Sequence, residues 1–81
     1  MSETNSVAAV FVRHLAAYLG QHTAPMAIKT FAKQALGTGP EQLRLSDTSK
    51  LLDAMRPMLS TLIGKQRAEE VATLIRRELG V

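Results

Sequence analysis

The 81-residue sequence contains no cysteine and no tryptophan. Without cysteine, the chain can form neither a disulfide framework nor a zinc site with thiolate ligands. Its aromatic residues are two Phe and one Tyr, although 46% of all residues are hydrophobic. A core must therefore be built mainly from aliphatic side chains. This composition favours one small helical domain that is stabilised by packing alone.

Acidic residues are missing from positions 4 to 40, whereas positions 41 to 81 carry six acidic and seven basic residues. The whole chain has a net charge of +3. The basic residues of the first half are Arg13, Lys29 and Lys33. Three separated cations fall short of the dense basic stripe that binding to phosphates requires. The charge distribution therefore argues against nucleic acid as the main partner.

A long hydrophobic run is also missing. The longest apolar stretch, from Val7 to Leu19, is interrupted by Arg13 and His14. It is shorter than the ~20 apolar residues that cross a bilayer. At the N-terminus, Glu3 stands where a signal peptide would carry basic residues. The sequence thus predicts no membrane span, a cytoplasmic location and a disordered segment over residues 1–5.

Apolar residues recur at positions i, i+3, i+4 and i+7 along most of the chain, which is the spacing of amphipathic helices. Glycines mark the expected helix ends, and Ser46 and Asp47 are expected to cap the third helix. Pro57 lies inside that helix, where we expect a kink or a break. The sequence predicts one helical domain over residues 6–81, with a hairpin over 6–37, a loop over 38–45 and a hairpin over 46–80.

The two predicted hairpins match each other at a shift of 44 residues. The shift aligns Leu15 with Leu59, Gly20 with Gly64 and Ala24 with Ala68, and the surrounding apolar positions also agree. Two explanations remain open: an internal duplication, or two unrelated amphipathic hairpins of similar length. Both give an all-α fold, a four-helix array of two αα-hairpins. A duplication would add pseudo-twofold symmetry.

Motifs for catalysis or cofactor binding are not evident. Neither His14 nor His22 has a carboxylate or a second histidine at the helical spacing of metal ligands. The glycine-rich segment at residues 37–40 lacks the Lys of a phosphate-binding loop. We therefore expect no metal, no cofactor, no small-molecule substrate and no catalytic residue, so that the chain is not an enzyme.

The first helix is unusual because residues 7 to 12 are apolar on every side. An exposed helix normally has a polar face. Either this helix is the central element of the domain, or its second face binds a protein partner or a second copy of the chain. The second possibility identifies the candidate partner-binding residues as Val7, Val10, Phe11 and Val12.

An alternative interpretation is a small basic regulator that binds nucleic acid. It depends on bringing two pairs of cations into one surface that faces phosphates. The candidate residues are Lys29, Lys33, Arg76 and Arg77.

Five short motifs suggest a family. They are Leu15-Ala-Ala-Tyr-Leu-Gly20 followed by Ala24-Pro-Met-Ala27, and Leu51-Leu52-Asp-Ala-Met-Arg-Pro57 with Leu62-Ile-Gly-Lys65 before Ala68-Glu-Glu-Val71. Together they resemble small helical accessory domains of bacterial signalling proteins, such as serine/threonine kinases and response-regulator-type proteins. The resemblance implies a non-catalytic docking module that acts by protein-protein contact in bacterial signalling.

Overall fold

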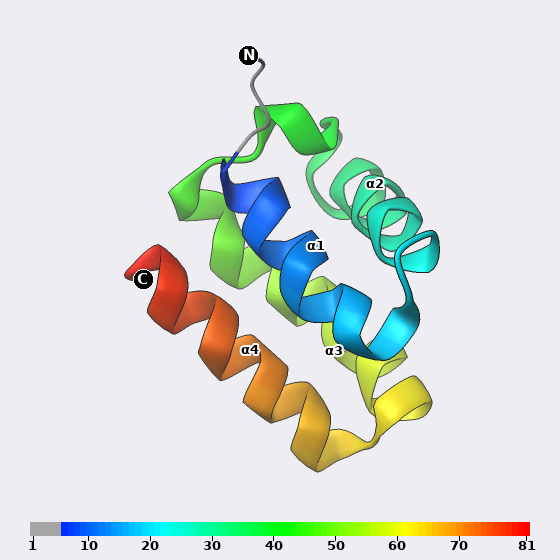
Figure 1. Cartoon of the computed structure of the whole chain (residues 1–81). Helices are drawn as coiled ribbons and strands as arrows, with labels where there is room; N and C mark the ends of the chain where they lie inside the picture. The colour runs from blue at the N-terminus through cyan, green and yellow to red at the C-terminus, as the bar shows by residue number, and fades with distance from the viewer. Residues whose placement is uncertain (1–5) are drawn as a thin grey trace.

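The structure is a computed structural model that describes residues 6–81, so the segment predicted to be disordered, residues 1–5, lies outside the described residues. The described part is an all-α array of four helices without strands (Figure 1). Two short 3₁₀ helices, η1 (Pro40–Gln42) and η2 (Leu45–Asp47), lie between the hairpins. The four α-helices are α1 (Ser6–Leu19), α2 (Thr23–Leu36), α3 (Thr48–Ile63) and α4 (Lys65–Leu79).

The helices form a closed ring of contacts. Within the hairpins, α1 packs on α2 and α3 packs on α4, and between the hairpins α1 packs on α4 and α2 packs on α3. In this ring α2 and α4 therefore lie at opposite corners, and so do α1 and α3 (Figure 1). This arrangement confirms the predicted four-helix array of two hairpins, because each hairpin covers the apolar face of the other.

The core is aliphatic apart from Phe11 and Met55, as the composition predicts. Every helix contributes buried side chains one turn apart, which is the spacing that places residues on one face. The fully buried positions at this spacing are Phe11 and Leu15 on α1, Ala24, Ile28 and Ala32 on α2, Leu51, Met55 and Leu59 on α3, and Ala68, Val71 and Ile75 on α4.

The two hairpin turns share one backbone arrangement. Gly20 and Gly64 both have positive φ angles, +92° and +91°. The N–H of Gly20 donates to Ala16 O, and the N–H of Gly64 donates to Ser60 O. Each glycine carbonyl then accepts from the buried alanine four residues later. These bonds repeat at the 44-residue shift, which is consistent with the predicted duplication; the duplication and its symmetry stay predictions.

The start of α3 differs from the prediction. Residues 45–47 form η2, and α3 begins at Thr48 rather than at residue 46. Asp47 precedes α3, but its side chain makes no capping bond to that helix. Instead its Oδ2 accepts a hydrogen bond of 3.0 Å from the N–H of Arg44. The predicted capping residue is thus used by the preceding turn.

No break occurs at Pro57, since α3 runs without interruption from Thr48 to Ile63, whereas the other expected outcome, a kink, stays a prediction. Proline removes one backbone donor from a helix and so leaves one carbonyl without its usual partner. Pro57 lies on the exposed side of α3, where water can supply that hydrogen bond. The Pro57 carbonyl itself accepts a bond of 3.0 Å from Thr61 Oγ1.

Candidate functional site

The predicted binding face of the first helix is part of the core. Val7 is 4% exposed, Val10 8% and Phe11 0%, while Val12 is partly buried against the same core cluster. Val7, Val10 and Phe11 are too buried for a partner to reach in the folded chain, so this site prediction needs correction. The reason is that α1 packs on both α2 and α4, which use its apolar side chains for the core.

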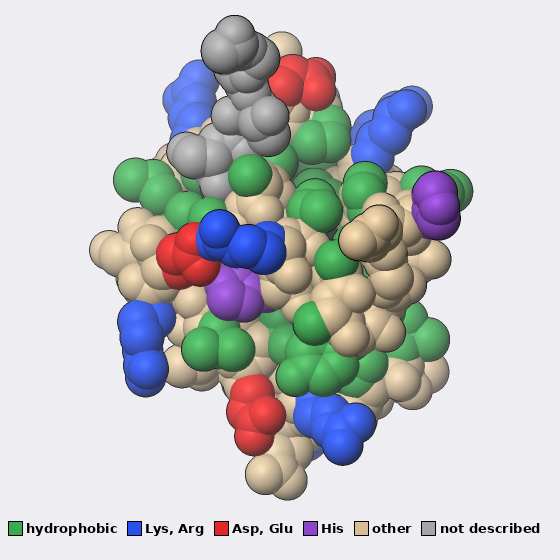
Figure 2. Space-filling view, viewed as in Figure 1, with side chains coloured by type: hydrophobic (Ala, Val, Ile, Leu, Met, Phe, Trp, Pro, Cys, Tyr) green, Lys and Arg blue, Asp and Glu red, His purple; other side chains and the backbone are tan. Residues whose placement is uncertain are grey.

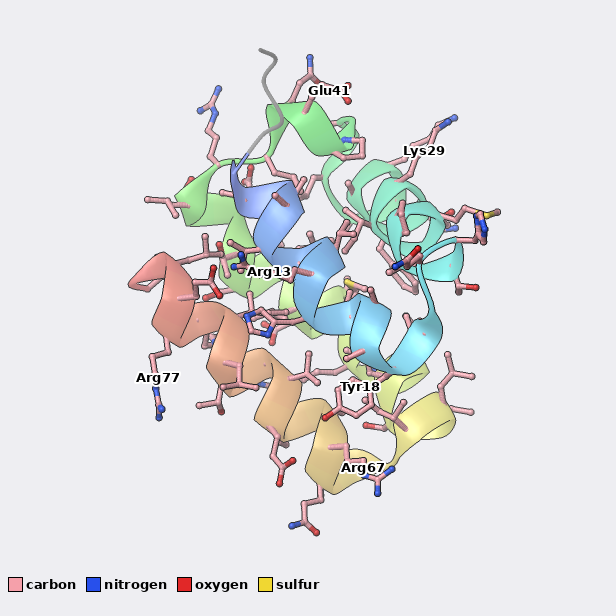
Figure 3. All side chains as sticks on the ribbon, viewed as in Figure 1. Arg13, Tyr18, Lys29, Glu41, Arg67 and Arg77 are labelled. Carbon is pink, nitrogen blue, oxygen red and sulfur yellow. The ribbon has the colours of Figure 1, made fainter. Side chains whose placement is uncertain are left out.

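The four cations of the nucleic-acid alternative do not form one surface. Lys29 and Lys33 are exposed on α2, whereas Arg76 and Arg77 belong to α4 at the opposite corner of the ring. Figure 3 shows Lys29 and Arg77 pointing away from each other on different sides of the molecule. Arg76 is also occupied, because its Nη1 donates to Ser49 Oγ at 3.0 Å.

A charged contact joins α1 to α4. His14 Nε2 lies 2.8 Å from Glu78 Oε1, and the guanidinium of Arg13 forms an ion pair with the other oxygen of the same carboxylate. Figure 2 shows a basic, an acidic and a histidine side chain gathered over the middle of these helices. Burial, and then the positive charge of Arg13, lower the pKa of His14. Because Arg13 already pairs with Glu78, the neutral imidazole is the form that fits this contact.

Two large apolar side chains lie beside this contact. Tyr18 is one helical turn beyond His14 on α1, and Leu74 is one turn before Glu78 on α4. Because the two helices run antiparallel (Figure 1), both displacements point in the same direction, so Tyr18 and Leu74 lie on the same side of this charged contact. Tyr18 is 41% exposed and Leu74 44%. We call this pair the α1–α4 patch; Tyr18 extends over α4 in Figure 3.

The outward side of α4 adjoins the α1–α4 patch. It carries a shallow depression that shares Leu74 with the patch. The aliphatic parts of long polar side chains form much of its surface, as is common on exposed helices. The depression is lined by Lys65, Gln66, Glu69, Glu70, Thr73 and Leu74.

The sequence contained a signal for one member of the patch. Leu74 is an aliphatic residue of the fourth helix that falls outside the inward-facing periodic set. Tyr18, by contrast, continues the i, i+3, i+4, i+7 apolar spacing of the first helix, so the sequence does not distinguish it from a packed residue, yet it is 41% exposed.

Two kinds of feature are absent from the described part of the chain: a group of metal-binding side chains and a helix that could cross a membrane. Among residues 6–81, no three His, Cys, Asp or Glu side chains are grouped so that they could hold a metal ion. In the same range, none of the helices has the length and apolar character needed to cross a membrane. No family model, curated protein or solved structure matches the chain.

Proposed function

We propose that the chain is a non-catalytic docking module that acts by protein-protein contact through the α1–α4 patch. The observation that carries the proposal is the exposure of two large apolar side chains, Tyr18 and Leu74, on the neighbouring helices α1 and α4, each more than two-fifths exposed. Single exposed apolar residues are ordinary on protein surfaces, whereas adjoining ones mark contact sites. The fold creates this pair, because the residues are 56 positions apart in the sequence.

The surroundings of the patch support the same role. The ion pair of Arg13 with Glu78 lies on one side, and the depression of α4 lies on the other. Apolar centres with polar rims are the usual organisation of protein interfaces, and tyrosine is enriched in their centres. The small size of the patch favours a transient contact over a permanent one.

The cellular setting is a further part of the proposal. The resemblance of the hairpin motifs to accessory domains of bacterial signalling proteins supports a proposed role in cytoplasmic signalling or regulation. In that setting the domain would hold a partner next to the signalling machinery and would carry out no reaction itself.

Site-specific photo-crosslinking in the native host tests the proposal. A photoreactive amino acid replaces Leu74 in one variant and Met26 in the control; Met26 is 68% exposed but lies on α2, at the opposite corner. We expect a discrete crosslinked product from position 74 and none from position 26. Adding Tyr18→Ser to the position-74 variant should remove the product. Equal products from both positions, or none from position 74, would contradict the proposed surface.

A further inference from the structure

We infer that the docking partner is a second copy of the chain. The two copies pack through the outward sides of their α4 helices, which run antiparallel to each other. The inference rests on the proposed function, because Leu74 belongs both to the α1–α4 patch and to the depression on α4. It replaces self-association through the first helix, whose candidate residues are buried or partly buried.

The argument begins with the charged side chains of α4 that already have partners within the chain. Glu69 Oε2 lies 3.5 Å from Arg56 Nη1 on α3, Arg76 bonds Ser49 on α3, and Glu78 pairs with α1. These three residues lie along the two edges of α4 that face its neighbours and are not free to bind elsewhere.

Four charged side chains of α4 have no ion-pair or hydrogen-bond partner among the described residues: Lys65, Arg67, Glu70 and Arg77. Glu70 and Arg77 are the exposed pair of opposite charge, and both lie beyond the first turn of the helix. They are seven residues apart, which is nearly two full turns, so both point from the same side of the helix about 10 Å apart. Thr73 and Leu74 lie midway between them and are both exposed.

This order of charges complements itself when two copies of α4 pair antiparallel. A twofold axis between Thr73 and Leu74 places Glu70 opposite Arg77 of the second copy, and the symmetry repeats the pair. Thr73 then faces Leu74 of the second copy, so the leucine is covered at the centre. A parallel pair in register would instead oppose like charges at both positions, which is unfavourable. The order of charges thus favours a second copy of the chain as the partner and an antiparallel orientation of the two α4 helices.

The strength of the dimer follows from its size. The 15 residues of α4 are about 22 Å long, so one helix face buries less than the ~1,600 Å² of a standard interface. We therefore expect a dimer that dissociates at low micromolar concentration and forms at about 0.1–1 mM.

Charge reversal combined with sedimentation equilibrium tests the inference on the full chain. Glu70→Arg and Arg77→Glu each replace two attractive pairs by two repulsive ones, and each should weaken the dimer by roughly tenfold. The double variant restores opposite charges across the axis and should dimerise like the wild type. An equimolar mixture of the two single variants should form a heterodimer, since all its pairs are attractive. Lys29→Glu, on the exposed side of α2, should leave the association unchanged.

Circular dichroism first tests whether every variant is folded. We expect that each one is, because positions 29, 70 and 77 are exposed. The inference is overturned if the wild type stays monomeric up to about 1 mM, or if the mixture and the double variant associate no better than the single variants. The crosslinking experiment separates this inference from the proposed function. A product at position 74 with the mass of two chains supports both, whereas a product with a different protein and a monomeric wild type overturns the inference alone.

Discussion

Two residues, His14 and Thr48, carry polar side chains at or near the core. The surroundings of each side chain determine how it affects the stability of the folded protein. Burial disfavours the charged form of His14, and the Glu78 carboxylate beside it already forms an ion pair with Arg13. Thr48 is 0% exposed at the start of α3, and its Oγ1 has no hydrogen-bond partner. The first residue should make stability depend on pH, and the second should lower stability at every pH.

We predict that the free energy of unfolding falls as the pH is lowered from 7 to 5. The folded state lowers the pKa of His14 below 6.5, so the unfolded chain binds the proton more readily. The contribution of the neutral imidazole is therefore complete above pH 6.5 and is lost as the pH falls through the folded pKa. Urea unfolding at several pH values measures this, and His14→Gln should flatten the dependence. His22→Gln, in the exposed turn, is the control and should keep it.

Thr48→Val should stabilise the protein by about 1 kcal/mol, because it replaces a buried hydroxyl that lacks a partner with a methyl group of similar size. Thermal and urea unfolding measure the change. Thr61→Val is the matched control: Thr61 is exposed, and its Oγ1 already donates to the Pro57 carbonyl, so no gain is expected. A loss of stability in Thr48→Val would show that its hydroxyl has a partner after all.

At the scale of the elements, the glycines that end helices adopt two different backbone conformations. The glycine after α2, Gly37, has φ +72° and ψ +20°, a left-handed conformation that Asn can also adopt. Gly64 joins α3 directly to α4 with φ +91° and ψ +152°, a region that is essentially restricted to glycine. The two glycines therefore tolerate substitution differently, although both end a helix.

Gly64→Asn should destabilise the protein by about 2–3 kcal/mol, and Gly37→Asn by less than about 1 kcal/mol. A Cβ would meet no atom within 4 Å at either position, so the difference isolates the backbone conformation. Urea unfolding of both variants measures it. Equal losses of stability would mean that the turn at Gly64 rearranges to accept a side chain.

At the scale of the whole molecule, every helix joins the two hairpins, because each contacts its own hairpin partner and one helix of the other hairpin. In α1, Phe11 is a large core side chain with no exposed surface. In a chain of 81 residues without disulfides, few side chains of this size are available to stabilise the fold.

Phe11→Ala should reduce the free energy of unfolding by about 3–5 kcal/mol, because it leaves a large cavity between the hairpins. Small domains are stable by about 5–15 kcal/mol, so this variant should unfold at much lower urea concentration. Met26→Ala, at a side chain that is 68% exposed, should change stability by less than about 0.5 kcal/mol. A small effect of Phe11→Ala would argue against a core position for this side chain.

The sequence predicted the helices better than the candidate site. The periodicity of Leu15, Ile28, Leu59 and Ile75 identified one buried face for each helix, and glycines marked the ends. The site prediction failed at Phe11, because an apolar residue looks the same in a sequence whether a core or a partner covers it. The sequence also did not show that the Asp47 carboxylate accepts its hydrogen bond from Arg44, because an Asp at this position can bond either the preceding turn or the following helix.

The sequence by itself determined the all-α class, the hairpin order and the aliphatic core, because helix periodicity and glycine positions act over a few residues. The tertiary structure alone decided which apolar side chains face solvent. Exposure depends on how many neighbouring helices enclose a position, and α1 is enclosed at Val10 but open at Tyr18. The packing of α1 on α4 also placed Tyr18 and Leu74 on the same side of their charged contact and left Glu70 and Arg77 on the outward side of α4, so the surface proposed for docking exists only after folding.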